Sequence, residues 1–388
     1  MDINPKSILF RDLREGVANV MSRYGPEYWR KLDEVSAYPE AFVKEMMESG
    51  YLAALIPEAY GGSGLGIAEA SVILEEINHL GGNAGVCHAQ MYIMGTLLRH
   101  GSEDQKRRYL PDIAKGKLRF QAFGVTEPDA GSDTLSIKTF ARKAGKGYIV
   151  NGQKIWTSRV AHSDLMLLIA RTTPKEEARK RTEGLSAFLV DLRASIGKGV
   201  TIQPIPTMMN HHSAQAFLED LAIPEENRLG EEGRGFSYLL DGLNAERILI
   251  AAECIGDAYW FLEKASAYAS SREVFGRPIG QNQGVQFPIA RGYASTRAAD
   301  LMRYEAAALF DKGEPCGPEA NMAKLLAADA SFEAGNVAIQ TFGGFGFAKE
   351  YDIERKFRET RLYQVAPIST NLILAYLGQH VLGMPRSY

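Results

Sequence analysis

The chain contains little cysteine: among 388 residues only Cys87, Cys254 and Cys316 occur, at spacings that match no metal-binding motif. An odd number without regular spacing argues against a disulfide framework and favours a reducing compartment. A strong charge of either sign is also missing, since the net charge is −3. Because nucleic acid attracts proteins that carry a basic surface, no nucleic-acid partner is expected.

Long hydrophobic runs are absent as well. No segment approaches the roughly 18 apolar residues of a membrane span. The first residues carry acids early and no long apolar core, unlike a secretory signal. We therefore expect a protein of the cytoplasm that does not associate with a membrane. The balanced charges at residues 175–183 predict a solvated loop.

Hydrophobic residues make up 45% of the chain and charged residues 23%, which is enough apolar material for a full core. A chain of this length has room for two or three domains. Its apolar periodicity changes twice, from helical to strand-like and back. The sequence thus predicts a multidomain α+β protein. It comprises an N-terminal α-helical domain (1–118), a middle β-barrel or β-sandwich domain (119–232) and a C-terminal four-helix bundle (233–388).

Within the first region, helical spacing of apolar residues predicts helices over residues 68–78, 89–100 and 103–110. In the middle region, Asn151-Gly152 lies between two strand-like segments and predicts a tight hairpin turn. Further strands are predicted at residues 165–171, 185–192, 200–205 and 214–222. The bundle helices are predicted at residues 236–270, 283–311, 318–341 and 369–382.

Two glycine-containing segments carry most of the functional information. Residues 123–133 read F-G-V-T-E-P-D-A-G-S-D, and residues 340–347 read Q-T-F-G-G-F-G-F. Such loops expose backbone amides and offer few side-chain obstacles, which suits phosphate-bearing or flat ring cofactors. In this order, and together with P-E-A-Y-G-G-S-G-L-G at residues 57–66, they resemble the acyl-CoA dehydrogenase flavoprotein family over nearly the whole chain.

This resemblance implies FAD as the cofactor and an acyl-CoA thioester as the substrate. The implied reaction is α,β-dehydrogenation to the trans-2-enoyl-CoA, with an electron-transfer flavoprotein as electron acceptor. It also implies a homotetramer or homodimer. Two alternatives stay open: an oxygen-using relative, such as an acyl-CoA oxidase or flavin monooxygenase, and a flavin-binding scaffold that has lost acyl-CoA chemistry.

The resemblance also assigns cofactor contacts. In the first motif and the tryptophan-containing strand after it, they are Phe123, Val125, Thr126, Gly131, Ser132, Trp156 and Ser158. In the C-terminal region they are Arg272, Phe275, Gln283, Gln340, Gly343, Gly344, Ser369 and Asn371. The family segment that matches Arg272 and Phe275 reaches the adenine-diphosphate half of FAD across a subunit interface, and the planar fork of arginine suits a pyrophosphate. Ser132 and Arg247 correspond to substrate-binding positions.

The position of the catalytic base agrees least well with the common pattern of the family. Many family members carry a glutamate in the loop before the last helix, but Pro367 stands there, and proline cannot accept a proton. Other members carry the base on a bundle helix, at the position of Glu246. The apolar run at residues 248–252 predicts that this helix is buried nearly all round. A carboxylate there is costly to desolvate unless it is paired or used for proton transfer.

Two other readings of these acids remain. Glu246 could be a paired structural acid, and Glu253, seven residues later on nearly the same face, is a second candidate base or a partner in a buried polar network. Pro367 also lacks the backbone N–H that polarises the thioester oxygen in the family. A neighbouring amide such as that of Ile368 could replace it. His211 and His212 predict a turn or exposed connection, and no metal site is predicted.

Overall fold

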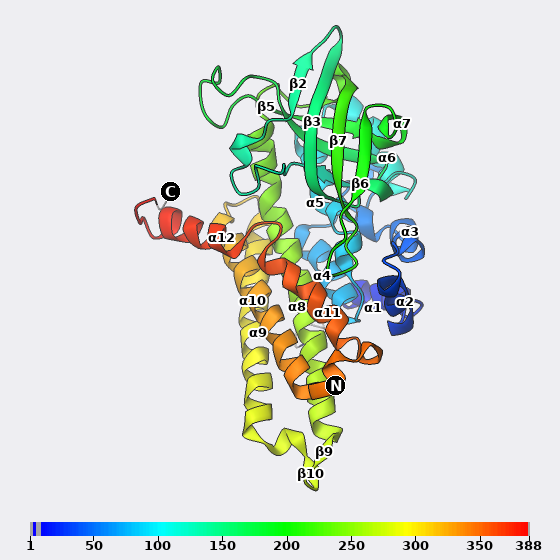
Figure 1. Ribbon diagram of the computed structural model, residues 1–388, viewed down its shortest axis with the longest axis vertical. Coiled ribbons are helices and arrows are strands. Elements are labelled where there is room, and N and C mark those ends of the chain that lie inside the picture. Colours follow the sequence, from blue (N-terminus) through cyan, green and yellow to red (C-terminus); the bar gives the residue numbers. More distant parts are fainter. Residues whose placement is uncertain (1–2, 5–8, 387–388) are drawn as a thin grey trace. The chain divides into compact units, whose positions relative to one another are not determined.

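The computed structural model describes residues 3–4 and 9–386. The chain divides into two compact units. We call residues 1–39, 66–84 and 244–388 the helical unit and residues 40–65 and 85–243 the sheet unit. Figure 1 traces the chain by colour, from helices through strands to helices. The predicted α+β class, with a helical start, a middle β domain and a helical end, is confirmed.

The sheet unit contains several helices. They are α3 (Glu40–Glu48), α5 (Ala89–His100), α6 (Glu103–Ala114) and the short α7 (Leu192–Ser195). α6 starts at a capping box, in which the Ser102 hydroxyl accepts from the Gln105 N–H and the Gln105 side chain accepts from the Ser102 N–H. The helices predicted at residues 89–100 and 103–110 are thereby confirmed.

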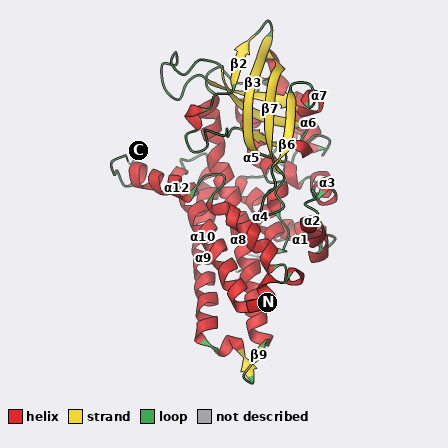
Figure 2. Ribbon diagram, in the orientation of Figure 1, coloured by secondary structure: helices red, strands yellow, loops and turns green. Residues whose placement is uncertain are grey.

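Among the described residues, the main sheet has eight strands, ordered β6-β7-β3-β2-β4-β5-β8, with β1 paired to β4. Figure 2 shows them in yellow, with β2, β3, β7 and β6 side by side. The β1–β4 and β2–β4 pairs are parallel, and the others are antiparallel. Their bounds are β1 Phe120–Gly124, β2 Phe140–Lys143, β3 Gly147–Ser158, β4 Leu165–Arg171, β5 Leu185–Asp191, β6 Val200–Pro204, β7 Ser213–Pro224 and β8 Arg228–Leu229.

The predicted hairpin turn at Asn151-Gly152 is wrong, because both residues lie inside the single strand β3. The register with β7 shifts between Val150 and Gly152, so the pair forms a bulge rather than a turn. Gly152 has φ 154°, and a Cβ there would lie 2.5 Å from Thr139 Oγ1. Glycine is therefore required for close backbone approach, and that requirement produced a turn-like sequence signal.

The sheet unit contains a buried apolar cluster, contributed largely by alternate residues of its strands, as expected where one face of each strand is buried. Its members include Ala122, Val150, Met166, Leu168, Phe188, Val190, Leu218 and Ile223. The candidate flavin segments lie at the ends of two strands that contribute to this core. β1 ends at Gly124, and β3 ends at Ser158.

The helical unit is built on three long helices, visible in red in Figure 2. Its helices are α1 (Arg11–Met21), α2 (Pro26–Glu34), α4 (Ile67–His79), α8 (Gly235–Ser271) from residue 244 onward, α9 (Gln283–Asp311), α10 (Gly317–Phe342), α11 (Ile353–Thr360) and α12 (Thr370–Tyr376). The predicted helices at 68–78, 236–270, 283–311 and 318–341 are confirmed. The fourth predicted bundle helix is shorter, since a π-helical segment at Leu377–Val381 follows α12.

Small residues let these helices approach closely. α10 buries seven alanines, Ala320, Ala323, Ala327, Ala328, Ala330, Ala334 and Ala338. On α8, a Cβ added at Gly256 would lie 2.2 Å from the Glu75 carbonyl oxygen of α4. The backbones of α4 and α8 are therefore in direct contact at this point.

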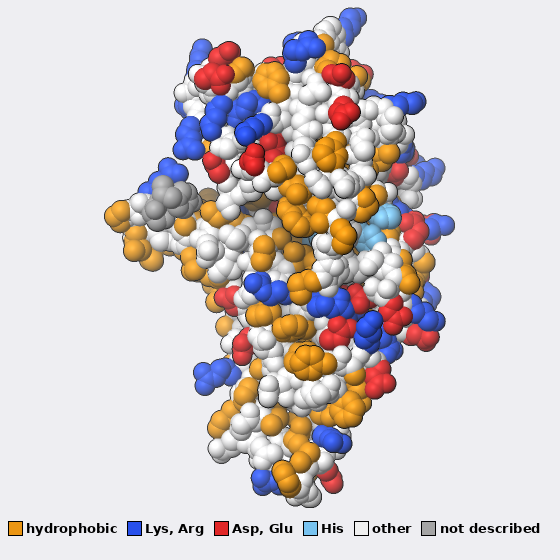
Figure 3. Space-filling model, in the orientation of Figure 1, with side chains coloured by type: hydrophobic (Ala, Val, Ile, Leu, Met, Phe, Trp, Pro, Cys, Tyr) orange, Lys and Arg blue, Asp and Glu red, His pale blue; other side chains and the backbone are white. Residues whose placement is uncertain are grey.

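The surface of the helical unit also exposes apolar side chains. Between α8 and α9 the chain forms the short hairpin β9 (Glu273–Val274) and β10 (Arg277–Pro278), and Phe275 at its tip is fully exposed. Figure 3 shows hydrophobic side chains in orange over the lower part of the view, where α8, α9 and this hairpin lie in Figure 1. Within residues 3–4 and 9–386, no helix combines the length and hydropathy needed to span a bilayer.

Candidate functional site

The first motif forms a loop that leaves β1 and is held by two buried charges. The Glu127 carboxylate accepts from the backbone N–H groups of Lys138 (2.6 Å) and Thr139 (2.9 Å). Lys154 Nζ donates to Glu127 Oε1 at 2.8 Å and to the Val125 carbonyl at 2.9 Å. Lys154 is completely buried. The loop backbone at Val125 is therefore fixed by an ion pair beneath it.

The electrostatics of this pair favour the charged forms near neutral pH. Burial lowers the pKa of Lys154 to about 8, and the Glu127 carboxylate opposes the decrease. Burial by itself raises the pKa of Glu127, but the Lys154 ammonium outweighs it and leaves that pKa below its ordinary value. The sequence interpretation missed both residues. An isolated lysine in the middle of an otherwise apolar-alternating strand was the available signal.

The predicted flavin strand lies beside this loop. The Ile155 N–H donates to the Thr126 carbonyl at 2.9 Å, which joins the loop to the end of β3. Trp156 has φ 58° and leaves 53% of its surface exposed. Ser158 closes the strand and is partly exposed. An exposed indole plane next to hydroxyls and backbone polar groups suits a flat heteroaromatic ring.

Further observations within the sheet unit test whether FAD fits. A Cβ added at Gly131 would find no atom within 4 Å in the part of the chain that the structure describes, so the loop backbone is open there. Ser132, next to it, is exposed. Thr157 Oγ1 is buried and has no hydrogen-bond partner among the described residues. Phe123 is partly exposed, and its ring centroid lies 6.5 Å from that of Tyr92. The donors, the open backbone and the aromatic rings fit an isoalloxazine ring.

The remaining predicted cofactor residues fall on three segments of the helical unit. Arg272, Phe275 and Gln283 come from the β9–β10 hairpin and the start of α9, and all three are exposed. Gln340, Gly343 and Gly344 mark the end of α10, where added Cβ atoms on the two glycines would meet nothing described within 4 Å. Ser369 and Asn371 begin α12, and the Ser369 hydroxyl caps that helix by accepting from the Leu372 N–H at 3.4 Å.

The predicted base lies on α8. Glu246 is 4% exposed, and residues 248–252 that follow it are all buried, as predicted. Arg247 Nη1 donates to Asn244 Oδ1 at 2.9 Å. Burial lowers the pKa of Arg247, and the charge of Glu246 opposes the decrease. Helix α8 thus carries a buried carboxylate and a partly buried guanidinium at adjacent positions.

Lys324 of α10 fixes the loop in which the sequence replaces the usual glutamate by proline. Its buried Nζ donates to the carbonyl oxygens of Tyr363 and Ile368, the latter at 2.7 Å. Burial lowers the pKa of Lys324 to about 8, and Glu246 is among the acids that oppose this decrease. The Lys324 ammonium thus holds the backbone on both sides of Pro367, and Pro367 itself is exposed.

Glu253 occupies a different position in the network. Tyr363 Oη donates to Glu253 Oε2 at 3.1 Å, and Asn78 Nδ2 donates to Tyr363 Oη at 3.3 Å. Glu253 is completely buried. Glu253, the second candidate base, therefore has the contacts of a structural partner.

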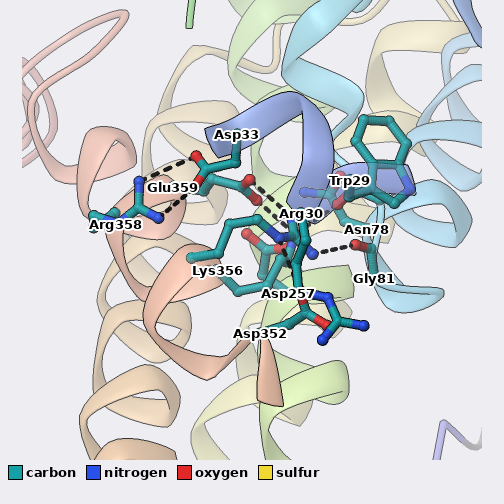
Figure 4. Close-up of polar contacts among 12 residues, drawn as sticks. Trp29, Arg30, Asp33, Asn78, Gly81, Asp257, Asp352, Lys356, Arg358 and Glu359 are labelled. Atoms are coloured by element: carbon teal, nitrogen blue, oxygen red, sulfur yellow. Dashed lines mark hydrogen bonds and ion pairs between the residues drawn. The ribbon is translucent and has the colours of Figure 1, made fainter. Parts of the chain in front are cut away.

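A second buried polar cluster lies further along α8. Lys356 of α11 forms ion pairs with Asp257 and with Glu359, the latter at 3.2 Å. Its Nζ also donates to the Gly82 carbonyl at 2.7 Å. Figure 4 shows Lys356 and Asp257 facing each other, and Arg358 facing Asp33. These charges are internally paired and connect α8, α11 and the turn after α4.

The two histidines of the predicted turn lie between β6 and β7. His211 is partly buried, and its Nε2 lies 3.1 Å from Ser158 Oγ. Among the residues that the structure describes, no group of three His, Cys, Asp or Glu side chains could hold a metal ion.

Comparison with known proteins identifies the family. Three family models match: the acyl-CoA dehydrogenase N-terminal domain over residues 10–117, the middle domain over 122–221 and the C-terminal domain over 233–372. Acyl-CoA dehydrogenase FadE12 of Mycobacterium tuberculosis is 36% identical over 379 residues, covering 97% of this chain and 96% of its own. This chain belongs to the acyl-CoA dehydrogenase family.

Other relatives and solved structures agree. The caffeyl-CoA reductase–Etf complex subunit CarC of Acetobacterium woodii is 34% identical over 340 residues, covering 86% of this chain and 88% of its own. The structure of glutaryl-coenzyme A dehydrogenase with glutaryl-CoA matches with a TM-score of 0.91 at 30% identity, covering 100% and 98% of the two chains. PigA with FAD and proline matches with a TM-score of 0.91 at 26% identity, covering 99% and 100%.

The expected class of activity is thereby confirmed. The protein is an FAD-dependent oxidoreductase that dehydrogenates acyl-CoA thioesters. The family assignment does not by itself identify the base.

Proposed function

We propose that Glu246 is the base that removes the α-proton of the thioester in this acyl-CoA dehydrogenase. The observation that supports this assignment is the burial of Glu246, at 4% exposure, on a helix whose next turn is entirely apolar. Removing a carboxylate from water is costly. A buried carboxylate that acts in proton transfer gains from that same environment, because burial strengthens it as a base.

Two observations disfavour the competing positions. Pro367 has no group that accepts a proton, and Glu253 already accepts from the Tyr363 phenol at 3.1 Å. In the proposed reaction, Glu246 takes the α-proton as H⁺, and bound FAD supplies the acceptor for the β-hydrogen as hydride. The product is the trans-2-enoyl-CoA. Arg247, adjacent to the base, and Ser132 are proposed to bind the thioester.

The thioester oxygen needs a hydrogen-bond donor, and Pro367 cannot supply one. We assign this role to the backbone N–H of Ile368. Because Lys324 holds the carbonyls of both Tyr363 and Ile368, the backbone is anchored on both sides of Pro367, next to this N–H. A donor that is already oriented contributes more to rate than one that must reorganise, and losing one typically costs on the order of 10²–10³-fold.

The proposed FAD contacts are those implied by the family resemblance. They are Phe123, Val125, Thr126, Gly131, Ser132, Trp156, Ser158, Arg272, Phe275, Gln283, Gln340, Gly343, Gly344, Ser369 and Asn371.

The exposed hairpin supports a proposal of assembly. Phe275 is fully exposed, and Val274 and Phe287 nearby are 39% and 55% exposed. Exposed apolar groups of this kind mark interaction surfaces. We propose a homodimer or homotetramer in which this hairpin contacts FAD bound to another copy. The proposed acceptor of electrons is an electron-transfer flavoprotein, in keeping with the Etf complex named for the CarC relative. The cytoplasm remains the predicted location.

The test is anaerobic mixing of the purified holoenzyme with short-, medium-, long- and branched-chain acyl-CoA thioesters, followed by flavin absorbance. We expect at least one thioester to bleach the flavin without oxygen, and an electron-transfer flavoprotein to restore its colour. Reoxidation that is rapid only with oxygen would favour an oxidase. No bleaching with any thioester would contradict the proposal and favour a scaffold without acyl-CoA chemistry.

A further inference from the structure

The end of β3 carries a side-chain hydrogen-bond chain that the reaction described above does not use. Ser158 Oγ lies 3.1 Å from His211 Nε2 and 3.0 Å from Ser213 Oγ. Ser158 and Ser213 are directly opposite partners in the β3–β7 register. All three residues belong to the sheet unit. The hydroxyl of Ser158 is thus held between two polar groups that come from the strand beside it and the turn before that strand.

The surroundings of His211 favour a neutral ring. Burial, followed by the positive charge of Arg159 and then the neighbouring His88 and His212, lowers the pKa of His211 well below its ordinary value. Arg159 is itself anchored, since its guanidinium donates to the Gly85 carbonyl and its Nη2 lies 3.3 Å from His88 Nε2. A neutral imidazole has one donor and one acceptor nitrogen, so it exchanges a directed hydrogen bond with Ser158.

We propose that His211 is a positioning residue for bound FAD, which acts by fixing the direction of the Ser158 hydroxyl. This inference rests on the proposed role of Ser158 as a flavin contact. A serine hydroxyl has one O–H and two lone pairs. Because His211 and Ser213 occupy two of these directions, only the third is left for a contact with the flavin. Hydrogen bonds to the flavin ring set its electronics, so His211 tunes the reduction potential of FAD without touching it.

The test compares four variants of the holoenzyme: His211→Leu, His211→Gln, Ser158→Ala and the double variant with Ser158→Ala and His211→Leu. The readouts are the FAD content, the visible spectrum and the equilibrium of FAD reduction against a reference dye. A net hydrogen bond is worth about 0.5–1.5 kcal/mol, so the reduction equilibrium should change about three- to tenfold in His211→Leu. Glutamine places an amide nitrogen near the position of Nε2 and should stay within about twofold of the wild type.

The double variant shows whether His211 acts through Ser158. We expect its reduction equilibrium to equal that of Ser158→Ala alone, because the histidine then has no hydroxyl to orient. A wild-type equilibrium in His211→Leu, or additive changes in the double variant, would overturn the proposal. If His211→Leu retains no FAD, His211→Asn replaces it, since asparagine is too short to reach Ser158. Failure of the wild type to bleach with any thioester would contradict the proposed function instead, and leaves this comparison intact.

Discussion

The phenol of Tyr363 donates a 3.1 Å hydrogen bond to Glu253 Oε2 in the interior of the helical unit. This contact distinguishes the two candidate bases on α8, because it gives Glu253 a hydrogen-bond partner from the segment that precedes Pro367. Glu246, seven residues earlier on the same helix, is buried at 4% exposure beside Arg247. The two acids should therefore respond differently to the same substitution.

Glu246→Gln should leave a folded, yellow protein that is reduced slowly by its thioester. A positioned base contributes about 10²–10⁴-fold to proton transfer, so the rate of flavin bleaching in anaerobic stopped-flow should fall by a comparable factor. Glu253→Gln is the matched control. It should lower the melting temperature because the buried hydrogen bond from Tyr363 is weakened, while bleaching stays within about threefold of the wild type. A reversed pattern would assign the base to Glu253.

Lys154→Met should loosen the first motif. The substitution leaves the Glu127 carboxylate buried and without its ammonium partner, which typically costs about 3–5 kcal/mol. It also removes the donor to the Val125 carbonyl. We expect a lower melting temperature and a higher Kd for FAD, measured by flavin fluorescence. Adding Glu127→Gln removes the unpaired charge and should recover part of the loss. Full FAD affinity in Lys154→Met would show that the ion pair does not shape the loop.

Asp257 should make stability depend on pH. Burial raises the pKa of Asp257 to about 7, against the opposing charge of Lys356, whereas an unfolded aspartate titrates near about 3.9. Between these values the folded chain holds a proton that the unfolded chain has released. The contribution of this group to the free energy of unfolding is therefore greatest at low pH, is lost as pH rises toward about 7, and is constant above it.

Denaturant unfolding of the wild type and of Asp257→Asn, at about pH 5 and about pH 8, measures this contribution. The difference between the two pH values should be smaller in Asp257→Asn by up to about 3 kcal/mol, since about two pH units of this window lie below the folded pKa of about 7 and each is worth about 1.4 kcal/mol. Other groups contribute equally to both proteins and cancel in the comparison. An unchanged difference would mean that Asp257 titrates at the same pH in the folded and unfolded chains.

Phe275→Asp should weaken assembly. The phenylalanine is fully exposed on the hairpin tip, and a charge there would have to be desolvated in an interface. We expect a smaller species in sedimentation velocity and a loss of FAD when the protein is diluted. Val35→Asp places the same charge at an exposed apolar position of α2's C-terminal end, where Val35 is 72% exposed, and should change neither property. Equal behaviour of both variants would contradict a role for the hairpin.

The sequence allowed a good prediction of the long elements. The helices at 283–311 and 236–270 were recognisable because many turns repeat the same apolar spacing, so a single atypical residue does not obscure the period. The bulge at Gly152 was misread for the opposite reason. Asn-Gly is a short local signal, and a turn and a close backbone approach both require glycine at that position. Only the pairing with Thr139 and with β7 distinguishes them.

The candidate site also contains features that could be read from one element and features that could not. Burial of Glu246 could be predicted from the apolar residues that follow it on one helix. The contacts between Lys154 and Glu127, and between His211 and Ser158, join residues 27 and 53 positions apart. No periodicity within a single element reports such pairs, because they depend on which strand lies beside which. The predicted domain boundaries and the individual cofactor contacts remain predictions.

The exposed ring of Phe275 at the tip of the β9–β10 hairpin has a consequence in the cell. If one copy completes the cofactor site of another, newly made chains acquire their flavin only as fast as they find each other. Catalytic capacity then rises more steeply than the amount of polypeptide when synthesis is low. A modest change in expression would thus act as a threshold for the whole oxidation step.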